Sequence, residues 1–337
     1  MIDSLREYAK LVRPYGILFL GFTPVFGAIC NGETDFFRLF ILFLIGILAH
    51  IFTFVQNDIF DIEIDKKSSY VSERPLIIGT VSNRAAISIV IFSLILSVAM
   101  AGIFLFTTFS FLVLLLSFLL MTLYNKYSKS LFCMEYILGI GVFTYSLFGA
   151  LTVSDKISNL AIIVGLVGMM QWLFSVGIFA NMKDVKYDTK MGVKTTPTIL
   201  GVKEVKNELQ ITTIFKSYAF ATKILHIFIA SLPFLLQLTS IYVFNLPIPS
   251  FFFAFLSIIV LYLVIKIFST PISQRDKMLV YEGLQEGLSL LLIPTALMSY
   301  LFEKIGVTQT ILIIVLMILW PLSSLRVVFG KKLIPLE

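Results

Sequence analysis

The sequence predicts an all-α membrane protein, a polytopic bundle of nine or ten transmembrane helices. First, 58% of its 337 residues are hydrophobic and only 14% are charged, whereas soluble domains are closer to half apolar and one quarter charged. Second, the charged residues gather in a few short clusters. Third, apolar segments of roughly 16 to 25 residues separate these clusters, and a helix of that length crosses a hydrocarbon core of about 30 Å.

Ten apolar segments are candidates for membrane-spanning helices. We expect helices over residues 15–30, 37–56, 84–104, 106–124, 136–153, 160–180, 218–243, 249–268, 287–302 and 309–325. The ninth segment is one of the two shortest and the least secure, so a bundle of nine helices is the alternative. Residues 1–13 mix charged and apolar side chains without a cleavable signal, which favours an amphipathic helix at the membrane surface.

The basic residues predict the orientation of the bundle. With the N-terminus placed in the cytoplasm, all but three of the 26 lysines and arginines lie on or towards the cytoplasmic face, as the positive-inside rule requires. The three exceptions are Arg38, Lys156 and Lys304. We therefore expect a multi-pass protein of the plasma membrane with its active site facing the cytoplasm. Basic loops beside anionic lipid explain the net charge, so no nucleic-acid partner is expected.

Acidic residues form a first cluster at the cytoplasmic end of the second predicted helix. Asn57, Asp61 and Asp65 recur every four residues, so a continuous helix places them in one stripe, with Asp58 beside it. Carboxylates stacked in this way repel one another, and they are costly at a membrane boundary unless a positive charge joins them. A divalent cation with oxygen ligands would neutralise the stripe.

A second acidic cluster follows the sixth predicted helix. Asp184 and Asp188 again lie four residues apart and are expected on one helical face. The same segment carries lysines, whose ammonium groups are point charges suited to phosphate; they are Lys183, Lys186, Lys190 and Lys194. The acids alone would repel a diphosphate. We therefore expect Mg2+, which binds through a few carboxylates together with substrate phosphates.

Two other interpretations of the acidic clusters compete with this one. Cytoplasmic loops are commonly charged, so the clusters could be solvated loops. A cation-coupled transporter could also use acidic stripes, but it would place them deep in the membrane near its midplane. Both clusters instead lie at the cytoplasmic ends of helices. That position favours a substrate with a polar head at the interface and an apolar tail in the bilayer, as in a polyprenyl diphosphate.

The two motifs resemble those of the UbiA superfamily of intramembrane prenyltransferases. The similarity rests on Asn57-Asp58-x-x-Asp61-x-x-x-Asp65 with Arg74-Pro75-Leu76, and on Asp184-x-x-x-Asp188 with Gly192-Val193-Lys194-Thr195-Thr196-Pro197. Arg13-Pro14 before the first helix and Tyr124 with Lys129 after the fourth also match. The similarity extends over about residues 10–270, while residues 271–337 are less typical. We expect the whole chain, residues 1–337, to form one membrane-embedded domain.

The resemblance implies a bundle with a central cavity, cytoplasmic cap loops and two Mg2+ ions that hold a polyprenyl diphosphate. The implied metal ligands are Asn57, Asp58, Asp61, Asp65, Asp184 and Asp188. The implied diphosphate contacts are Lys129, Arg74, Lys194 and Tyr124. Lys129 is also expected to be catalytic, with Asp65 or Asp188 as the candidate general base. The allylic diphosphate would ionise, and an acceptor would capture the carbocation.

Two classes of acceptor stay open. An aromatic ring, as in quinone biosynthesis, would attack through carbon. An alcohol, as in the geranylgeranylglyceryl phosphate route of archaeal ether lipids, would attack through oxygen. We prefer the aromatic acceptor on the breadth of the family alone. Glu135 departs from the family pattern, which more often has an uncharged residue there.

Three further features carry less weight in the sequence. Glu282 and Glu286 lie one helical turn apart, with Arg275, Asp276 and Lys277 upstream. They could form a third rim of the active site, but we interpret them as a solvated helix end. His50 and His226 each lie alone in an apolar segment, which is typical of packed core histidines. The many phenylalanines are expected to face lipid or fill the core.

Overall fold

Helices dominate the computed structural model, which describes residues 2–68, 71–205 and 208–330 of the chain and omits the side chains of residues 2–4. The long helices are α3 (Phe36–Asp65), α5 (Asn83–Phe104), α6 (Thr108–Tyr127), α7 (Met134–Leu151), α8 (Asn159–Trp172), α12 (Thr213–Leu235), α13 (Ile248–Ser269) and α17 (Val307–Phe329). α8 continues through a π-helix, η2 (Leu173–Ala180), into α9 (Asn181–Lys183). All of these are long and apolar enough to cross a membrane.

Two further crossings are bent. α1 (Ile2–Val12) leads through η1 (Pro14–Gly16) into α2 (Ile17–Cys30), with a bend of 42°. Near the C-terminus, η3 (Ile272–Gln274), α14 (Arg275–Leu290) and α15 (Leu292–Ala296) continue into α16 (Met298–Lys304) after a bend of 59°. With these two pairs, the described residues contain up to ten spans.

The two ends of the described chain favour the ten-span count over nine. The guanidinium of Arg6 donates a hydrogen bond of 2.8 Å to the carbonyl of Val328. α1 and the last turn of α17 therefore lie at the same end of the bundle, which requires an even number of crossings. The ninth predicted span exists but is a broken helix. Its break follows Ala296, where a single continuous helix was expected.

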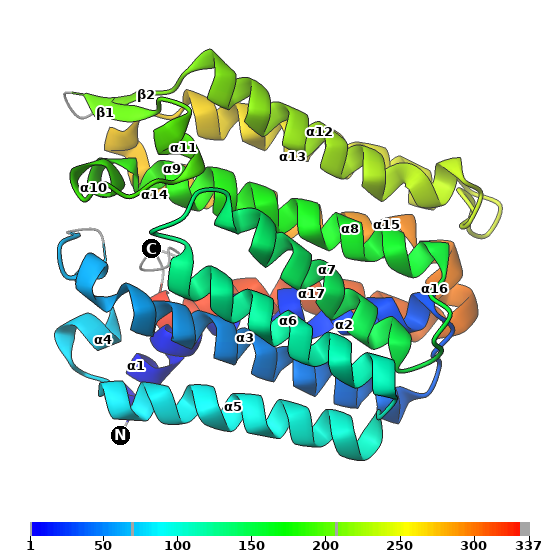
Figure 1. Cartoon of the computed structure of the whole chain (residues 1–337). Coiled ribbons are helices and arrows are strands. Elements are labelled where there is room, and N and C mark those ends of the chain that lie inside the picture. The colour runs from blue at the N-terminus through cyan, green and yellow to red at the C-terminus, as the bar shows by residue number, and fades with distance from the viewer. Residues whose placement is uncertain (1, 69–70, 206–207, 331–337) are drawn as a thin grey trace.

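Short elements gather at one end of the bundle and form what we call the cap (Figure 1). The cap consists of α4 (Pro75–Ile78), α10 (Val185–Lys190), α11 (Thr196–Ile199) and a two-stranded antiparallel hairpin of β1 (Lys203–Val205) and β2 (Glu208–Gln210). In the hairpin, Glu204 lies opposite Leu209. At the opposite end, Figure 1 shows loops that join the long helices and the short helix α16.

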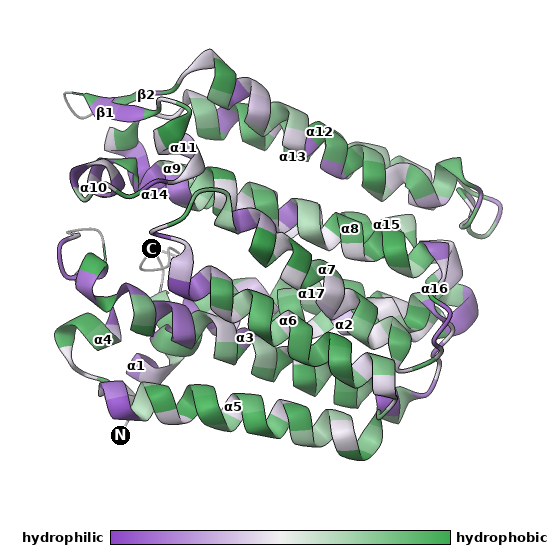
Figure 2. Ribbon diagram, viewed as in Figure 1, coloured by the Kyte–Doolittle hydropathy of each residue, from purple (hydrophilic) through white to green (hydrophobic). Residues whose placement is uncertain are grey.

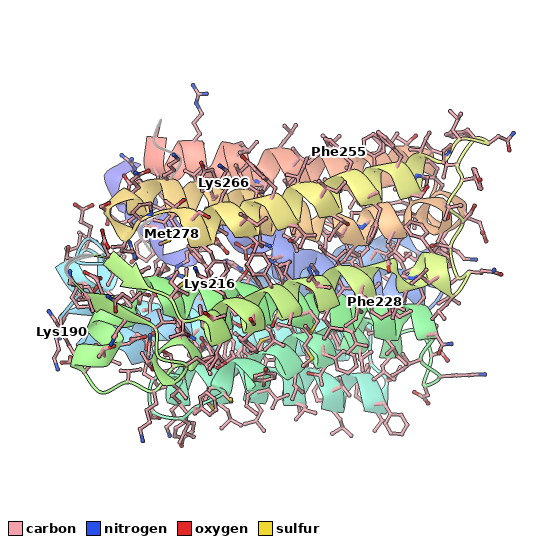
Figure 3. All side chains as sticks on the ribbon, turned by 90° about the horizontal axis from the view of Figure 1, so that it is seen from above. Lys190, Lys216, Phe228, Phe255, Lys266 and Met278 are labelled. Carbon is pink, nitrogen blue, oxygen red and sulfur yellow. The ribbon has the colours of Figure 1, made fainter. Side chains whose placement is uncertain are left out.

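Side-chain polarity follows the same division. Figure 2 shows mostly apolar residues along the long helices and hydrophilic residues concentrated at the two ends. Phe228 on α12 and Phe255 on α13 lie along the middle of the bundle in Figure 3, and each is 52% exposed, as expected for side chains that face lipid. Lys190 lies at the cap end in the same view. The bundle therefore has the apolar belt of a multi-pass membrane protein.

Close backbone contacts hold α2 at the centre of the bundle. A Cβ atom added at Gly149 of α7 would lie 1.9 Å from the carbonyl oxygen of Pro24, and one at Gly46 of α3 would lie 2.5 Å from that of Leu20. Only glycine permits these approaches, in keeping with the use of small residues where membrane helices pack closely. α2 is thereby fixed between α3 and α7, in contact with both.

The basic residues agree with the predicted charge asymmetry, with one correction. Arg38 lies at the end opposite the cap, where it pairs with Glu33 at 2.6 Å and donates to the carbonyl of Thr152. Lys304 ends α16 at the same end. Lys223, which was counted towards the cap face, lies inside the bundle with no exposed surface. Lys223 is the one charged residue within an otherwise apolar segment, and its composition does not show whether such a side chain reaches the surface or is buried.

Candidate active site

The first acidic motif lies on one uninterrupted helix. α3 continues for 30 residues to Asp65, so Asn57, Asp61 and Asp65 lie along one stripe, as predicted. Asp58 and Asp61 are buried, with 4% and 7% of their surface exposed, and Asp65 is half-buried. The helix ends at Asp65, and its C-cap residue Lys66 begins a turn into the cap.

Two arginines from distant parts of the chain converge on this motif. Arg13 pairs with Oδ1 of Asp58 at 2.6 Å. Arg74 pairs with Oδ2 of Asp65 at 2.6 Å and with Oδ1 of Asp58 at 3.3 Å. Arg74 is placed there because the following Pro75 begins the short helix α4, and proline suits the first position of a helix. The predicted phosphate ligand Arg74 thus lies beside the predicted metal ligands.

Arg13 is held in an unusual backbone conformation, with a φ of 54°. A non-glycine residue adopts this region only at a cost, which the surroundings must offset. The ring of His50 hydrogen-bonds the carbonyls of Val12 and Arg13, each at 3.1 Å. The indole of Trp320 on α17 donates to the carbonyl of Pro14 at 2.7 Å. His50 is therefore a packed, hydrogen-bonded core residue, as predicted, and it fixes the bend that directs Arg13 to Asp58.

The second motif does not share the continuous helix of the first. The π-helix η2 leads into α9, and at Asp184 the backbone leaves the helical conformation with φ −105° and ψ 2°. α10 then begins at Val185. The backbone N–H of Asp188 still donates to the carbonyl of Asp184 at 3.1 Å. The two acids remain one turn apart, as expected for one helical face, although a turn at Asp184 separates α9 from α10.

Asp184 is surrounded by positive charge. It pairs with Lys183 at 3.1 Å and with Arg275 at 3.2 Å, and Arg275 also donates to the carbonyl of Lys183 at 2.8 Å. Burial acts to raise the pKa of Asp184, but Lys183 and Arg275 outweigh it and hold that pKa at about 2. Asp184 is therefore ionised throughout the physiological range.

Asp188 is more deeply buried, with 1% of its surface exposed. Its Oδ1 pairs with the ammonium of Lys129 at 3.3 Å, while its Oδ2 has no hydrogen-bond partner among the described residues. Burial raises the pKa of Asp188 against the opposing charge of Lys129. A buried carboxylate oxygen without a partner is costly, so this atom is open to a positively charged ligand.

Lys129 connects the two motifs. Burial acts to lower its pKa, but the charges of Asp188, Asp61 and Asp184 raise that pKa above its ordinary value. The hydroxyl of Tyr124 contributes in the same direction. Lys129 is therefore a permanent cation between the acids of α3 and those after η2, and Tyr124 lies beside it.

The remaining predicted residues are less closely engaged. Asn57 is half-buried on the α3 stripe. Lys194 is exposed and, within the part of the chain that the structure describes, forms no ion pair. It lies next to Thr195, which caps α11 through reciprocal hydrogen bonds with Thr198. The structure therefore brings Lys129 and Arg74 to the acids but leaves Lys194 at the rim.

Sequence reasoning did not pair three basic residues with the acids, and it misjudged one segment. Arg13, Lys183 and Arg275 all pair with acids of the two motifs. Arg275 comes from the segment before Glu282 and Glu286, for which we preferred a solvated helix end over a third rim of the active site. That interpretation is wrong for Glu282, which is buried with 8% exposure. The only signal was the cluster of charges at 275–277, which sequence alone could not place opposite Asp184.

Glu135, the residue that departs from the family pattern, is also buried at this end of the bundle. Its carboxylate accepts a hydrogen bond from the hydroxyl of Thr196. The side chain lies against Gly177 of η2, where an added Cβ would lie 2.7 Å from its Cγ. Glu135 therefore joins the start of α7 to the second motif.

The carboxylates of the two motifs suit Mg2+ that binds together with a substrate phosphate. Among the described residues, no three acidic, histidine or cysteine side chains are grouped tightly enough to hold an ion by themselves. Mg2+ commonly takes only one or two carboxylates and completes its shell with waters and substrate phosphates. Two carboxylate pairs, with a partnerless oxygen on Asp188, suit such ions bound together with a diphosphate.

Comparison with known proteins places this geometry in a family. Residues 19–277 match the model of the UbiA prenyltransferase family. Digeranylgeranylglyceryl phosphate synthase of Thermococcus gammatolerans is 31% identical over 206 residues, which make up 59% of this chain and 70% of that protein.

Solved structures share the fold. The apo structure of a UbiA homologue from Aeropyrum pernix K1 superposes with a TM-score of 0.64 at 16% identity, covering 84% of this chain and 96% of that one. A UbiA homologue from Archaeoglobus fulgidus bound to GPP and Mg2+ gives 0.57 at 17% identity, covering 85% and 99%. The family match spans most of the chain and both acidic motifs, and the chain therefore belongs to the UbiA prenyltransferase family, as a multi-pass membrane prenyltransferase.

Proposed function

We propose that this enzyme transfers a polyprenyl group from its diphosphate to an acceptor, with Mg2+ bound by the two acidic motifs. The observation that carries the proposal is the pairing of Lys129 with Asp188 and of Arg74 with Asp65. Each motif thus carries a cation beside its acids. A diphosphate arriving with Mg2+ would exchange these partners, so that the metal meets the carboxylates and the two basic side chains meet the phosphates.

The residues divide into two roles in this proposal. Mg2+ would be held by Asn57, Asp58, Asp61, Asp65, Asp184 and Asp188, and when bound it supplies positive charge to the leaving group. Lys129 and Arg74 would hold the oxygens of the diphosphate, with Tyr124 donating a hydrogen bond. Lys194, at the exposed rim of the site, would be a further contact to the diphosphate in this proposal. Arg13 holds the carboxylate of Asp58 in place through its 2.6 Å ion pair.

The reaction breaks the bond between C1 of the prenyl chain and the diphosphate oxygen, and the diphosphate leaves with both electrons. Charge that develops on the leaving oxygens is stabilised by preorganised cations, which is a large source of catalysis in enzymes. The allylic cation then forms a new bond to the acceptor, which loses a proton. Asp65 and Asp188 are the proposed bases for that proton.

For the acceptor, we place a phosphate-bearing lipid alcohol first. The support is the 31% identity to digeranylgeranylglyceryl phosphate synthase and the exposed lysines beside the second motif. Lys190 and Lys194 are exposed and form no ion pair within the described residues. The aromatic acceptor that we preferred from the sequence is the second candidate, and the experiment below tests both. In either case, the cap is proposed to face the cytoplasm at the plasma membrane.

The test is turnover of radiolabelled geranylgeranyl diphosphate by the purified protein in lipid nanodiscs. Geranylgeranylglyceryl phosphate, 4-hydroxybenzoate, dihydroxynaphthoate and homogentisate are supplied in parallel, with and without Mg2+. We expect a lipid product that requires Mg2+ and forms with the lipid phosphate. If only an aromatic acceptor gives product, our preference for the lipid phosphate over the aromatic ring is wrong.

A binding measurement separates a wrong acceptor from a wrong reaction. Mg2+ and prenyl diphosphate together should raise the midpoint of thermal unfolding, because ligands that bind only the folded state stabilise it. Either one alone should have little effect. If no acceptor reacts and the combination gives no stabilisation, the proposed reaction is wrong.

A further inference from the structure

The last described helix, α17, is the most peripheral of the unbent spans. Only 11% of its apolar stretch is buried, the lowest share among the eight unbent spans of the described chain. It also follows residue 277, where the match to the family model ends. Membrane helices gain no hydrophobic free energy from packing against one another, so hydrogen bonds and close contacts hold them together. The hydrogen bonds of α17 therefore indicate its role.

Two hydrogen bonds join the cap end of α17 to the beginning of the chain. The indole N–H of Trp320 donates to the carbonyl of Pro14 at 2.7 Å. The guanidinium of Arg6 donates to the carbonyl of Val328 at 2.8 Å. Tryptophan is common as an interfacial anchor of membrane proteins, but the N–H of Trp320 is committed to the protein backbone. α17 is thereby tied to the segment where α1 bends into α2.

The carbonyl that Trp320 holds belongs to a strained turn. Arg13, the residue before Pro14, has φ 54° and ψ 61°, a left-handed conformation that is unfavourable for a residue with a side chain. The ring of His50, which has no exposed surface, holds the carbonyl of Arg13 at 3.1 Å. Trp320 is 38% exposed. The turn is therefore held by His50 from the interior and by Trp320 from the exposed side.

This turn decides where the side chain of Arg13 lies, because φ and ψ fix the direction of the Cα–Cβ bond. The guanidinium pairs with Oδ1 of Asp58 at 2.6 Å, and the two side chains are 10% and 5% exposed. It also lies 5.2 Å from the centre of the Phe54 ring. If Arg13 returned to an ordinary helical or extended conformation, its Cβ would point elsewhere and the ion pair would break. The N–H of Trp320 therefore supports this ion pair through the backbone.

The ion pair in turn determines what Arg74 can do. Arg74 pairs with Asp65 at 2.6 Å and, more distantly, with Asp58 at 3.3 Å. A buried carboxylate that loses its close partner is costly. Without Arg13, Asp58 would therefore draw Arg74 towards itself and away from Asp65. In the proposed function, Arg74 is one of the two cations that hold the diphosphate oxygens.

We propose that Trp320 is a positioning residue for the first acidic motif. Its N–H holds the turn that places Arg13 on Asp58, which leaves Arg74 available to Asp65 and to the diphosphate. The helix outside the family match thus tunes the affinity of the site for its donor substrate. The placement of Arg13 follows from the contacts alone, and the effect on the diphosphate rests on the proposed function.

The first measurement needs no ligand. Phenylglyoxal reacts with accessible guanidinium groups, and peptide mass spectrometry of the full-length protein in lipid nanodiscs gives the labelling rate of each arginine. Trp320→Phe removes the N–H and keeps an aromatic ring. We expect Arg13 to be labelled about fivefold faster in this variant, since losing one hydrogen bond raises the population of the open turn by about that factor. Arg38, at the opposite end of the bundle, is the internal reference.

Tyr300→Phe is the matched control. The hydroxyl of Tyr300 donates to the carbonyl of Ile29 at 3.2 Å, so it also joins the C-terminal segment to α2, but at the end opposite the cap. Labelling of Arg13 should stay unchanged in this variant. Unchanged labelling of Arg13 in Trp320→Phe, or an equal increase in Tyr300→Phe, would overturn the proposal.

The second measurement concerns the diphosphate. Geranylgeranyl S-thiolodiphosphate, which resists ionisation, is titrated with saturating Mg2+, and the rise in the midpoint of thermal unfolding gives its affinity. Trp320→Phe should weaken this affinity about fivefold, the effect of one hydrogen bond. In an Arg13→Met background the same substitution should weaken it no further, because residues that act through one contact are not additive.

The two measurements separate this proposal from the proposed function. If the unaltered protein does not bind the analogue with Mg2+, the proposed function is wrong, while the labelling still decides the role of Trp320. If the analogue binds equally well to Trp320→Phe and to the unaltered protein, Trp320 does not tune the site. A further loss of affinity in the Arg13→Met background would show that Trp320 acts by another route, and the proposal would fail.

Discussion

The two acidic motifs have the same spacing but different backbones. Asp61 and Asp65 lie on a helix of 30 residues that runs without interruption into the cap. Asp184 and Asp188 come after eight residues of π-helix, and the backbone turns at Asp184 itself. π-Helical turns are rare and are found most often at functional sites. The comparison teaches that a shared pattern of residues can reflect a shared ligand rather than a shared secondary structure.

The electrostatic surroundings of the two motifs differ as well. Arg13 and Arg74, which neutralise the first motif, both come from the N-terminal part of the chain, near α3 in sequence. The second motif draws Lys129 from the end of α6 and Arg275 from the start of α14. The second motif is therefore tied to more distant parts of the chain, and its geometry depends on the packing of the C-terminal helices.

The largest expected effect tests whether both motifs serve one site. Asp61→Asn and Asp188→Asn each remove one negative charge while preserving shape. We expect each to lower kcat/KM for prenyl transfer by about 10²–10³-fold, the usual cost of removing one group that stabilises the transition state. Steady-state kinetics at saturating Mg2+ measure this.

Glu63→Gln is the control for that experiment. Glu63 lies between Asp61 and Asp65 on α3, but its side chain is 80% exposed and, among the described residues, forms an ion pair only with Lys66. Its activity should be unchanged. A large loss in Asp61→Asn with normal kinetics in Asp188→Asn would separate the two motifs and contradict a shared site.

A smaller effect, on stability, compares the arginines of the two motifs. Arg13→Met leaves Asp58, which is 4% exposed, with a single basic partner at 3.3 Å. Breaking a buried ion pair in this way costs about 3 kcal/mol. Arg275→Met should cost about 1 kcal/mol, because the side chain of Asp184 is 27% exposed and keeps Lys183. Thermal unfolding in nanodiscs gives both values.

A double variant distinguishes lost charge from lost packing. Arg13→Met combined with Asp58→Asn removes the uncompensated carboxylate and should recover a large part of the stability. Recovery would show that the ion pair, rather than the stacking of Arg13 over Phe54 at 5.2 Å, accounts for the loss. If the double variant is no more stable than Arg13→Met, the electrostatic explanation is wrong.

The sequence predicted the first motif more accurately than the second for a physical reason. Helical periodicity reports correctly on a continuous helix, and α3 is one. It cannot report a π-helix, because residues 173–180 carry the same apolar composition as an α-helix. The buried position of Lys223 and the reach of Arg275 to Asp184 were also beyond sequence reasoning, since both depend on contacts between residues distant in the chain.

Another expected effect on stability, smaller than that of Arg13→Met, concerns the close packing that positions the second motif. Gly177→Ala would place a Cβ 2.7 Å from Cγ of Glu135 and 3.0 Å from its Cβ. These atoms are close to the backbone of α7 and cannot move away freely. We expect a loss of about 1–2 kcal/mol from overpacking, measured by thermal unfolding. The hydrogen bond from Thr196 to Glu135 should be displaced, so prenyl transfer should slow in parallel.

Gly283→Ala provides the matched comparison, since Gly283 also lies within a helix but has no atom within 4 Å of its added Cβ. Alanine is the better helix former, so this variant should be more stable by about 0.5–1 kcal/mol. Opposite signs for the two substitutions would establish that contact with Glu135, rather than helix propensity, decides the outcome at Gly177. A stabilised Gly177→Ala would mean that η2 can move away from α7, and the second motif would then be less rigidly placed than the first.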